Sequence, residues 1–382
     1  MYGERVMNLR LLPLLALGLA ACDQDYTVNP QPPDVDPMDI TECGFTRVDA
    51  TAYYRYDCNP VFTTTGEGWA ETIGATGFNV TEVMGHPMYQ LWYTGLTDNG
   101  SSFPPYAMGY AASADGTTFT PFADNPVLAQ SKGDAFDSDY MSGNQVVWDP
   151  STAQYVMIWQ GIHDDTDPTK IVDALGVGTS PDGVKWTRFA KNPVFDLGMG
   201  GKAISYCWPL DLTLGDISGY TGYVAGGSGR SSTCQVYRIN ASSLGKWDAD
   251  DTPVLTVGAD GAWDDTGMTG LSIATLGGTR YMYYIGFGDW TQSGNYQLAT
   301  HAFLGLATYD QDAGKWVREP DPLPLNMTPE GEVGGIEALT VGNRIHMWIT
   351  DNYGDETAVG YFLYDPDRAE AEDNGDSGAA EE

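Results

Sequence analysis

The chain has 382 residues, of which 52 are Asp or Glu and 18 are Lys or Arg, so its formal net charge at pH 7 is -34. A field of that sign repels nucleic acids and anionic lipid headgroups, and we therefore exclude both as expected partners. The charge favours solubility; it is also compatible with calcium binding or a high-salt habitat, and charge alone does not separate these explanations.

The first 22 residues have the pattern of a bacterial export signal. Arg5 and Arg10 form a positive start, residues 11–20 form a short apolar core, and the segment ends Leu-Ala-Ala-Cys at Cys22. The pattern resembles a lipoprotein signal, in which Cys22 becomes the lipidated first residue of the mature chain. The alternative is an ordinary secretory signal with an incidental cysteine. We expect an exported protein that acyl chains anchor to the cell envelope.

The rest of the chain divides by composition into three parts. Residues 23–42 contain four prolines, five aspartates and no Lys or Arg, which predicts a disordered tether. Residues 43–367 are predicted to form one domain. Residues 368–382 are almost all Ala, Gly, Asp, Glu and Ser, so we expect a disordered acidic tail. Nothing after the signal has the composition of a membrane-spanning helix.

A turn followed by an outer strand recurs through the domain and defines its organisation. It is clearest in residues 180–195, where Asp182-Gly183 suits a tight hairpin turn and Pro193 suits an edge strand or a strand end. The spacings between successive copies are 66, 67, 60 and 69 residues, which indicates five similar units. The copies begin at Asn59, Asn125, Asn192, Thr252 and, more loosely, Asp321.

A second strand repeats in phase with the first. Runs of aromatic and β-branched residues occupy 89–95, 155–161, 281–286 and 345–350, with a weaker copy at 220–226. Four strands in a unit of this length are the content of a propeller blade, so the sequence predicts an all-β, five-bladed β-propeller. The fifth unit supplies only three strands. We therefore expect residues 53–62 to be the outer strand of the last blade, so that an N-terminal strand closes the ring.

Four cysteines lie in the domain: Cys43, Cys58, Cys207 and Cys234. An even number in an exported chain favours disulfides over metal binding or catalysis. Three pairings are possible, and we favour Cys43 with Cys58 and Cys207 with Cys234. The second pairing requires a bond between strands that a third strand separates.

One end of the ring is expected to gather polar and aromatic side chains. The loops that enter each blade, and the loops between its second and third strands, both return to that end. Aromatic rings stack on sugar rings and carboxylates accept hydrogen bonds from hydroxyls, so a glycan is the predicted ligand. The candidates are Asp137, Asp139, His163, Tyr206, Trp263, Asp264, Asp265, Trp290, Glu332 and, on an inner strand, Glu337.

Structural explanations compete with a functional one for these residues. Phe136-Asp137 and Trp263-Asp264 repeat, as residues that cap turns between blades would. His163 lies beside Asp164 and Asp165, but no second histidine accompanies it at the spacing of a metal site. We therefore predict no required cofactor, with calcium binding left open.

The Ser-x-Asp-Gly-x-x-Trp turn and the Asn-Pro-Val-Phe strand resemble the blades of the five-bladed arabinanase, levansucrase and invertase superfamily of carbohydrate-active enzymes, nearest its mannoside-phosphorylase-like branch. The resemblance covers residues 53–367. It implies an Asp at the start of the first inner strand, a second Asp on blade 2 and a Glu near blade 3. Here the first inner strand begins Thr-Gly-Phe-Asn at Thr76, and no Glu occurs between Glu82 and Glu319. The catalytic triad of the family is therefore not carried over to this chain.

Three functions remain on this basis. We favour a monomeric, lipid-anchored propeller that binds a glycan without cleaving it. An alternative is hydrolysis or transfer by an atypical carboxylate set, Asp137, Asp265 and Glu332, since glycosidic cleavage needs an acid and an opposed carboxylate. A second alternative is a scaffold for protein partners.

Overall fold

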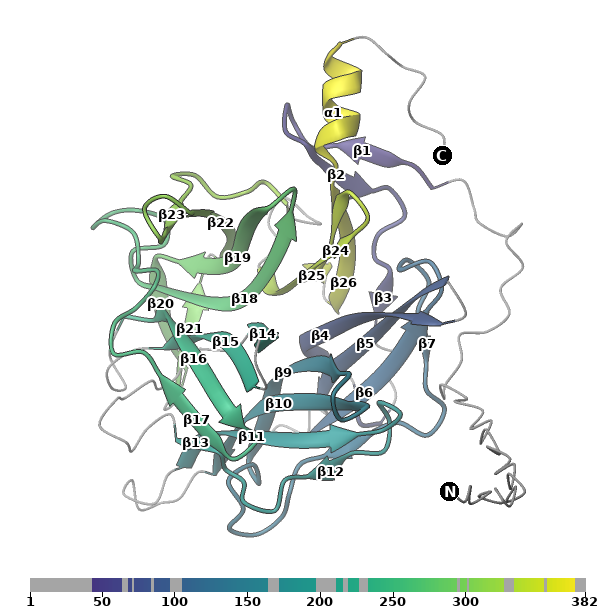
Figure 1. The fold of residues 1–382 in the computed structure, drawn as a ribbon, viewed down its shortest axis with the longest axis vertical. Helices are drawn as coiled ribbons and strands as arrows, with labels where there is room; N and C mark the ends of the chain where they lie inside the picture. The colour runs from purple at the N-terminus through teal and green to yellow at the C-terminus, as the bar shows by residue number, and fades with distance from the viewer. Residues whose placement is uncertain are drawn as a thin grey trace, which may run out of the picture.

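A computed structural model describes residues 43–63, 68–70, 72–83, 86–96, 105–163, 172–196, 211–215, 219–226, 233–293, 296–300, 302–325, 333–353 and 356–374. These residues are almost all in β-strands, with α1 (Pro366–Asp373) as the helix among them. The strands form blades arranged around a central axis (Figure 1). No helix in these ranges is long and apolar enough to span a membrane.

Each blade is an antiparallel sheet of four main strands, some with a short additional piece. Blade 1 contains β4 (Thr72–Val83), β5 (His86–Leu96), β6 (Tyr106–Ser113), β7 (Thr120–Pro121) and β8 (Leu128–Ala129). Blade 2 contains β9 (Tyr140–Asp149), β10 (Gln154–His163), β11 (Val172–Ser180), β12 (Thr187–Arg188) and β13 (Phe195–Asp196). Blade 3 contains β14 (Asp211–Gly215), β15 (Gly219–Gly226), β16 (Gln235–Ser243) and β17 (Lys246–Ala249).

Blade 4 contains β18 (Gly267–Leu276), β19 (Thr279–Phe287), β22 (Phe303–Asp310) and β23 (Lys315–Arg318), and the hairpin β20 (Asp289–Ser293) and β21 (Tyr296–Thr300) lies between its second and third strands. Blade 5 contains β24 (Val333–Val341), β25 (Arg344–Tyr353), β26 (Glu356–Tyr364) and the N-terminal strands β1 (Phe45–Arg47), β2 (Tyr53–Tyr56) and β3 (Phe62–Thr63). The inner strands β4, β9, β14, β18 and β24 contact one another in that order, and β24 contacts β4. The predicted five-bladed propeller is confirmed.

The N-terminal strand closes the ring, as predicted. β2 pairs with β26 through Tyr53 opposite Tyr364, and β3 pairs with the same strand through Phe62 opposite Val359. The ring of Tyr53 also packs on that of Tyr364, with centroids 4.8 Å apart. The last strand of the chain is therefore not left as an open edge.

The repeated Asn-Pro stretch marks the point where an outer strand breaks into two short pieces. The side chain of Asn125 accepts a hydrogen bond from the backbone N–H of Tyr110 at 2.9 Å and donates to its carbonyl at 3.0 Å. Asn192 makes the same pair of bonds with Val177, and Asn59 makes them with Tyr361. The Asn amide thus replaces the missing outer strand as hydrogen-bond partner. It satisfies the backbone N–H and C=O of the third strand where the outer strand is interrupted.

The Ser-x-Asp-Gly turns join neighbouring blades. In blade 2 the Asp182 carboxylate accepts the backbone N–H groups of residues 184 and 185, and Gly183 has a positive φ of 78° that favours glycine. The carbonyl of Gly183 accepts the indole N–H of Trp92 from blade 1 at 2.8 Å. Trp348 of blade 5 donates in the same way to Gly116 in the turn of blade 1, also at 2.8 Å. Each of these two turns therefore forms a hydrogen bond to a tryptophan of the preceding blade in the ring.

The apolar core lies between adjacent blades. One cluster joins Trp92 and Tyr110 of blade 1 to Met157 and Trp159 of blade 2, and all four side chains are fully buried. A further cluster joins Trp348 of blade 5 to blade 1. This packing fixes the blades around the axis through hydrophobic burial.

The predicted disulfide between Cys43 and Cys58 is present, and it ties the start of the domain to the closing strand. Cys234 is also disulfide-bonded. Its predicted partner Cys207 lies outside the described residues, so this pairing stays a prediction. Cys22 and the tether also lie outside them.

The acidic tail differs from the prediction in its first part, because α1 extends to Asp373. Asp365 caps the helix by accepting the backbone N–H of Arg368 at 3.0 Å. Glu372 accepts the hydroxyl of Tyr54 at 3.0 Å, and Asp373 accepts from Arg47 at 2.7 Å. The helix is therefore held by the N-terminal strands, which composition alone does not reveal.

Candidate functional site

Where the structure describes them, the entry loops and the ends of the second strands lie at one end of the ring, which we call the entry face. It is the end where the inner strands begin and the second strands finish, as the pairing of Tyr140 with Ile162 and of Val333 with Asp351 shows. Tyr206 and Glu332 lie outside the described residues. Trp290 lies on β20, which pairs with β21.

Four inner strands are irregular close to this face. The register shifts between Ile73 and Thr76 in β4, at Gly143 in β9, at Gly270 in β18 and at Gly334 in β24. Gly143 and Gly270 have positive φ values of 63° and 48°. Such bulges turn side chains away from regular alternation and are common beside binding sites.

One layer of residues lies below the bulges, at equivalent positions of the five inner strands. Each member pairs with a residue of the second strand in its own blade. That residue lies three positions before Gly95, Gly161, Gly226 or Gly286 and, in blade 5, three positions before Asp351. The layer is Gly77, Gln145, Asp211, Ser272 and Glu337, opposite Trp92, Ile158, Tyr223, Tyr283 and Trp348 respectively. We call it the axial layer.

Two members of the axial layer meet across the axis. The side-chain amide of Gln145 in blade 2 donates to the Glu337 carboxylate of blade 5, with distances of 3.1 and 3.3 Å to its two oxygens. Blade 1 lies between these blades in the ring, and both side chains are only 3% exposed. Beside them, the Ser272 hydroxyl accepts the backbone N–H of Ala338 at 2.8 Å. Glu337, a predicted ligand-binding residue, therefore belongs to a group of buried polar side chains at the axis.

A second polar group lies at the rim of blade 2. Asp139 immediately precedes β9, and His163 ends β10. The Nδ1 atom of His163 lies 2.8 Å from Oδ2 of Asp139 and 2.9 Å from the Ser138 hydroxyl, which itself lies 3.1 Å from the same carboxylate oxygen. We call these three residues the rim cluster. Its geometry is not that of a nucleophilic triad, because both partners contact one nitrogen of the imidazole.

The entry-loop aromatic residues pack inside their own blades. Phe136 stacks on Trp159 at 6.2 Å, and Trp263 stacks on Tyr284 at 5.9 Å. In blade 1 Trp69 stacks on Tyr93 at 5.7 Å. Glycines of the second strands leave the space for these contacts, since an added Cβ would lie within 2.7 Å of the loop at Gly95, Gly161 and Gly286.

The adjoining aspartates are buried ion-pair partners. Asp137 has no exposed surface, and its Oδ2 lies 3.1 Å from Arg188 and 3.3 Å from the indole nitrogen of Trp159. Asp264 is 1% exposed, lies 3.1 Å from Arg318 and accepts the hydroxyl of Tyr284 at 2.9 Å. These contacts favour the structural explanation for both residues, and catalysis by Asp137 stays a prediction.

Asp265 and Trp263 stabilise the entry loop of blade 4. The carboxylate of Asp265 accepts the backbone N–H of Gly261 at 2.7 Å. The indole of Trp263 donates to the carbonyl of Pro320 at 3.1 Å. The contacts of Asp137 and Asp265 thus lie in different blades. Sequence reasoning missed Ser138 and Gln145; the available signal for Gln145 was its position two residues after Gly143 and directly before the apolar run Val146-Val147-Trp148.

No group of three or more His, Cys, Asp and Glu suited to a metal occurs among the residues that the structure describes. Calcium binding therefore stays an untested prediction.

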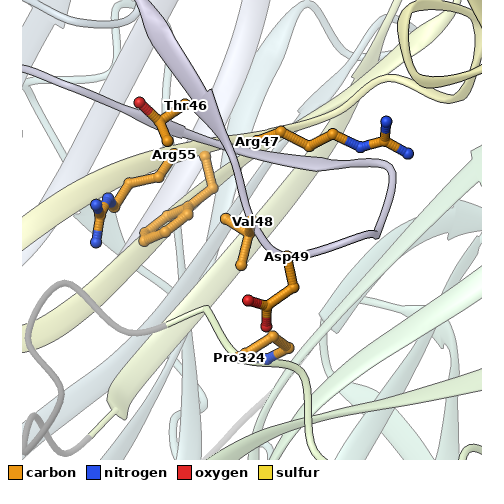
Figure 2. A pocket seen from close by; sticks show the side chains of 7 residues that line it. Thr46, Arg47, Val48, Asp49, Arg55 and Pro324 are labelled. Carbon is orange, nitrogen blue, oxygen red and sulfur yellow. The ribbon is translucent and has the colours of Figure 1, made fainter. Parts of the chain in front are cut away.

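The described residues also line a partly open cavity of about 200 Å³ beside the N-terminal hairpin, at the outer edge of blade 5. Arg47 and Arg55 point in opposite directions from it (Figure 2). Arg47 is already paired with Asp373 at 2.7 Å. The cavity is thus not part of the candidate site. Its lining is Thr46, Arg47, Val48, Asp49, Arg55, Pro324 and Phe362.

Comparison with known proteins supports the fold. No protein-family model matches the chain, and no curated protein matches it. Among solved structures, a glycosyl hydrolase from Bacteroides ovatus aligns with a TM-score of 0.58 at 17% identity, over 85% of this chain and 94% of that one.

Two further structures extend the comparison. A β-1,2-mannobiose phosphorylase from Listeria innocua, in complex with β-1,2-mannobiose, aligns with a TM-score of 0.57 at 13% identity, over 81% and 96% of the two chains. A GH32 β-fructofuranosidase from Bombyx mori aligns with a TM-score of 0.55 at 14% identity, over 78% of this chain and 60% of that one. The chain therefore has the five-bladed fold of glycoside-hydrolase-like propellers, at identities that establish the fold alone.

Proposed function

We propose that this chain is a monomeric, carbohydrate-binding propeller that a lipid on Cys22 holds at the cell envelope, with a glycan as the ligand of its entry face. The observation that carries the proposal is the pairing of Gln145 with Glu337 across the axis. The pair places an amide and a carboxylate at the axis, and these are group types that form hydrogen bonds with sugar hydroxyls. The glycoside-hydrolase-like neighbours support this ligand class.

Binding is favoured over cleavage by the state of the carboxylates. Glycosidic cleavage by the usual route needs a protonated acid and an opposed carboxylate, both facing the scissile bond. Among the described residues, Asp137 and Asp264 are buried against arginines, and Asp265 accepts a backbone N–H of its own loop. In the axial layer, Glu337 is the carboxylate whose contacts the structure describes. Its partner across the axis in these contacts is the side-chain amide of Gln145, which is not a second carboxylate.

The test is a glycan array with the full chain carrying Cys22→Ala, run beside a hydrolysis assay on the same glycans. Neutral oligosaccharides, including β-1,2-mannobiose, are the first probes. We expect binding without turnover. Glu337→Gln keeps the size of the side chain and removes its charge, so it should weaken binding at an unchanged melting temperature. Turnover that survives in this variant would instead favour the atypical hydrolase.

The anchor is tested separately. Cys22→Ala should release the protein from membranes while the propeller remains folded, because the lipid is attached outside the domain. Protein that still fractionates with membranes after a salt wash would contradict the lipoprotein assignment.

A further inference from the structure

The rim cluster fixes where the proton of His163 lies. An ionised carboxylate only accepts hydrogen bonds, so the 2.8 Å contact between Asp139 Oδ2 and His163 Nδ1 requires a proton on Nδ1. The Ser138 hydroxyl lies within hydrogen-bond distance of both atoms and donates to the carboxylate. In the neutral imidazole, the lone pair is then on Nε2.

The imidazole that carries this lone pair is not fully buried. The side chain of His163 is 18% exposed, and no hydrogen bond to Nε2 occurs within the described part of the chain. The rim cluster is also held in place: the backbone N–H of Asp139 donates to Ile162 at 3.1 Å, and the side chain of Gln130 donates to the carbonyl of Ser138. The imidazole therefore presents a hydrogen-bond acceptor of fixed orientation at the entry face.

Blade 4 shows that the architecture does not require these residues. Counting from the paired entry-loop aspartates and from the second-strand glycines, the equivalents of Asp139 and His163 are Thr266 and Gly288. There the Thr266 hydroxyl lies 2.6 Å from the carbonyl of Gly288 and 3.1 Å from the carboxylate of Asp265, so a hydroxyl and a backbone carbonyl join the same two segments without an imidazole. Joining the two segments in blade 2 therefore does not by itself require Asp139 and His163.

We propose that His163 contacts the ligand, with Nε2 accepting a hydrogen bond from a hydroxyl of a neutral glycan, and that Asp139 and Ser138 are positioning residues that hold the Nδ1–H tautomer. The inference rests on the proposed function and adds a recognition rule to it: the ligand must offer a hydroxyl donor at this point. Ligands that offer only acceptors there would face a lone pair and be rejected.

The tautomer is tested without a ligand. The full chain with Cys22→Ala, labelled with ¹⁵N histidine, contains four histidines, and His163→Gln assigns the signal of interest. We expect a neutral His163 protonated at Nδ1, with this preference weakened in Asp139→Asn and, as a milder second variant, in Ser138→Ala. A neutral His163 protonated at Nε2 would overturn the inference.

The contact is tested by binding of the array glycans, with β-1,2-mannobiose first. His163→Gln retains an acceptor near the position of Nε2 and should bind within about threefold of the parent, whereas His163→Met should lose roughly tenfold or more, as expected for one hydrogen bond. Asp139→Thr with His163→Gly reproduces the blade 4 arrangement and should melt like the parent yet bind weakly. Equal binding by the Gln and Met variants would overturn the contact. If no glycan binds, the proposed function falls together with the contact, whereas retained binding with the wrong tautomer overturns this inference alone.

Discussion

Replacing Asp137 with Asn separates a structural from a catalytic role for the entry-loop carboxylates. The substitution keeps the size of the side chain but removes the charge that faces Arg188 at 3.1 Å. Removing one partner of a buried ion pair ordinarily costs about 3–5 kcal/mol. The side chain of Arg188 keeps 32% of its surface exposed and also donates to the carbonyl of Ala129 at 2.6 Å. Solvent and this second partner offset part of the loss, so we expect about 2–3 kcal/mol.

The expected shift in melting temperature follows from chain length. Unfolding entropy is about 2 cal/mol/K per residue, so in a domain of about 330 residues a loss of about 2–3 kcal/mol lowers the melting temperature by roughly 3–4 °C. Calorimetry of the Cys22→Ala protein measures it. Asp264→Asn should cost at least as much, because its partner Arg318 is only 18% exposed.

Two controls make the result decisive. Asp265→Asn alters a partly exposed loop contact and should shift the melting temperature by about 1 °C or less. Combining Asp137→Asn with Arg188→Met should cost less than the sum of the single variants, because no charge is then left unpaired. An Asp137→Asn protein that melts like the parent but no longer binds glycan would refute the structural reasoning and restore Asp137 to the functional site.

Three other predictions concern closure, blade joining and pH. Deleting residues 43–63 should destabilise the ring far more than deleting residues 375–382, and equal melting temperatures would contradict closure by the N-terminal strand. Trp348→Phe removes the donor to Gly116 and part of a fully buried ring, so it should cost more than about 1 kcal/mol in denaturant unfolding; an unchanged midpoint would show that neither contact is stabilising. Partial desolvation within the turn raises the pKa of Asp115, but hydrogen bonds from neighbouring backbone and hydroxyl groups outweigh this effect and lower the pKa below its ordinary value of 3.8. Because the folded pKa is depressed, the carboxylate stabilises the fold above that value; Asp115→Asn should lower the melting temperature at pH 7, and the difference should shrink as the pH falls below 3.8, whereas a pH-independent difference would contradict this origin.

The blades were predictable because their signals are local and repeated. The Asn-Pro break and the Ser-x-Asp-Gly turn each depend on a few adjacent residues and on the third strand of the same blade, so copies in phase revealed the units. Their partners were not predictable from the motifs alone. Nothing in the sequence near Asn125 shows that its amide bonds both backbone groups of Tyr110.

The candidate site was less predictable because ring closure assembles it from distant segments. Gln145 and Glu337, which meet at the axis, are 192 positions apart. Asp137 carried an ambiguous signal, since a carboxylate beside an aromatic residue suits both sugar binding and packing. Its partner Arg188 is 51 positions away, on a strand that the sequence assigns to the outer part of the blade.

In a ring of repeated blades, residues that recur at equivalent positions indicate a structural role. Residues that differ between equivalent positions indicate a role that is specific to one blade. The loop aromatic rings and their glycines recur in blades 1, 2 and 4, and the aspartate–arginine pair recurs in blades 2 and 4, because each blade must solve the same packing problem. The axial layer obeys the opposite pattern: its five equivalent positions carry five different residues, from Gly77 to Glu337. Five different residues at equivalent positions are what an asymmetric ligand on a repeated scaffold would require, so under the proposed function we expect the glycan to be recognised near this layer.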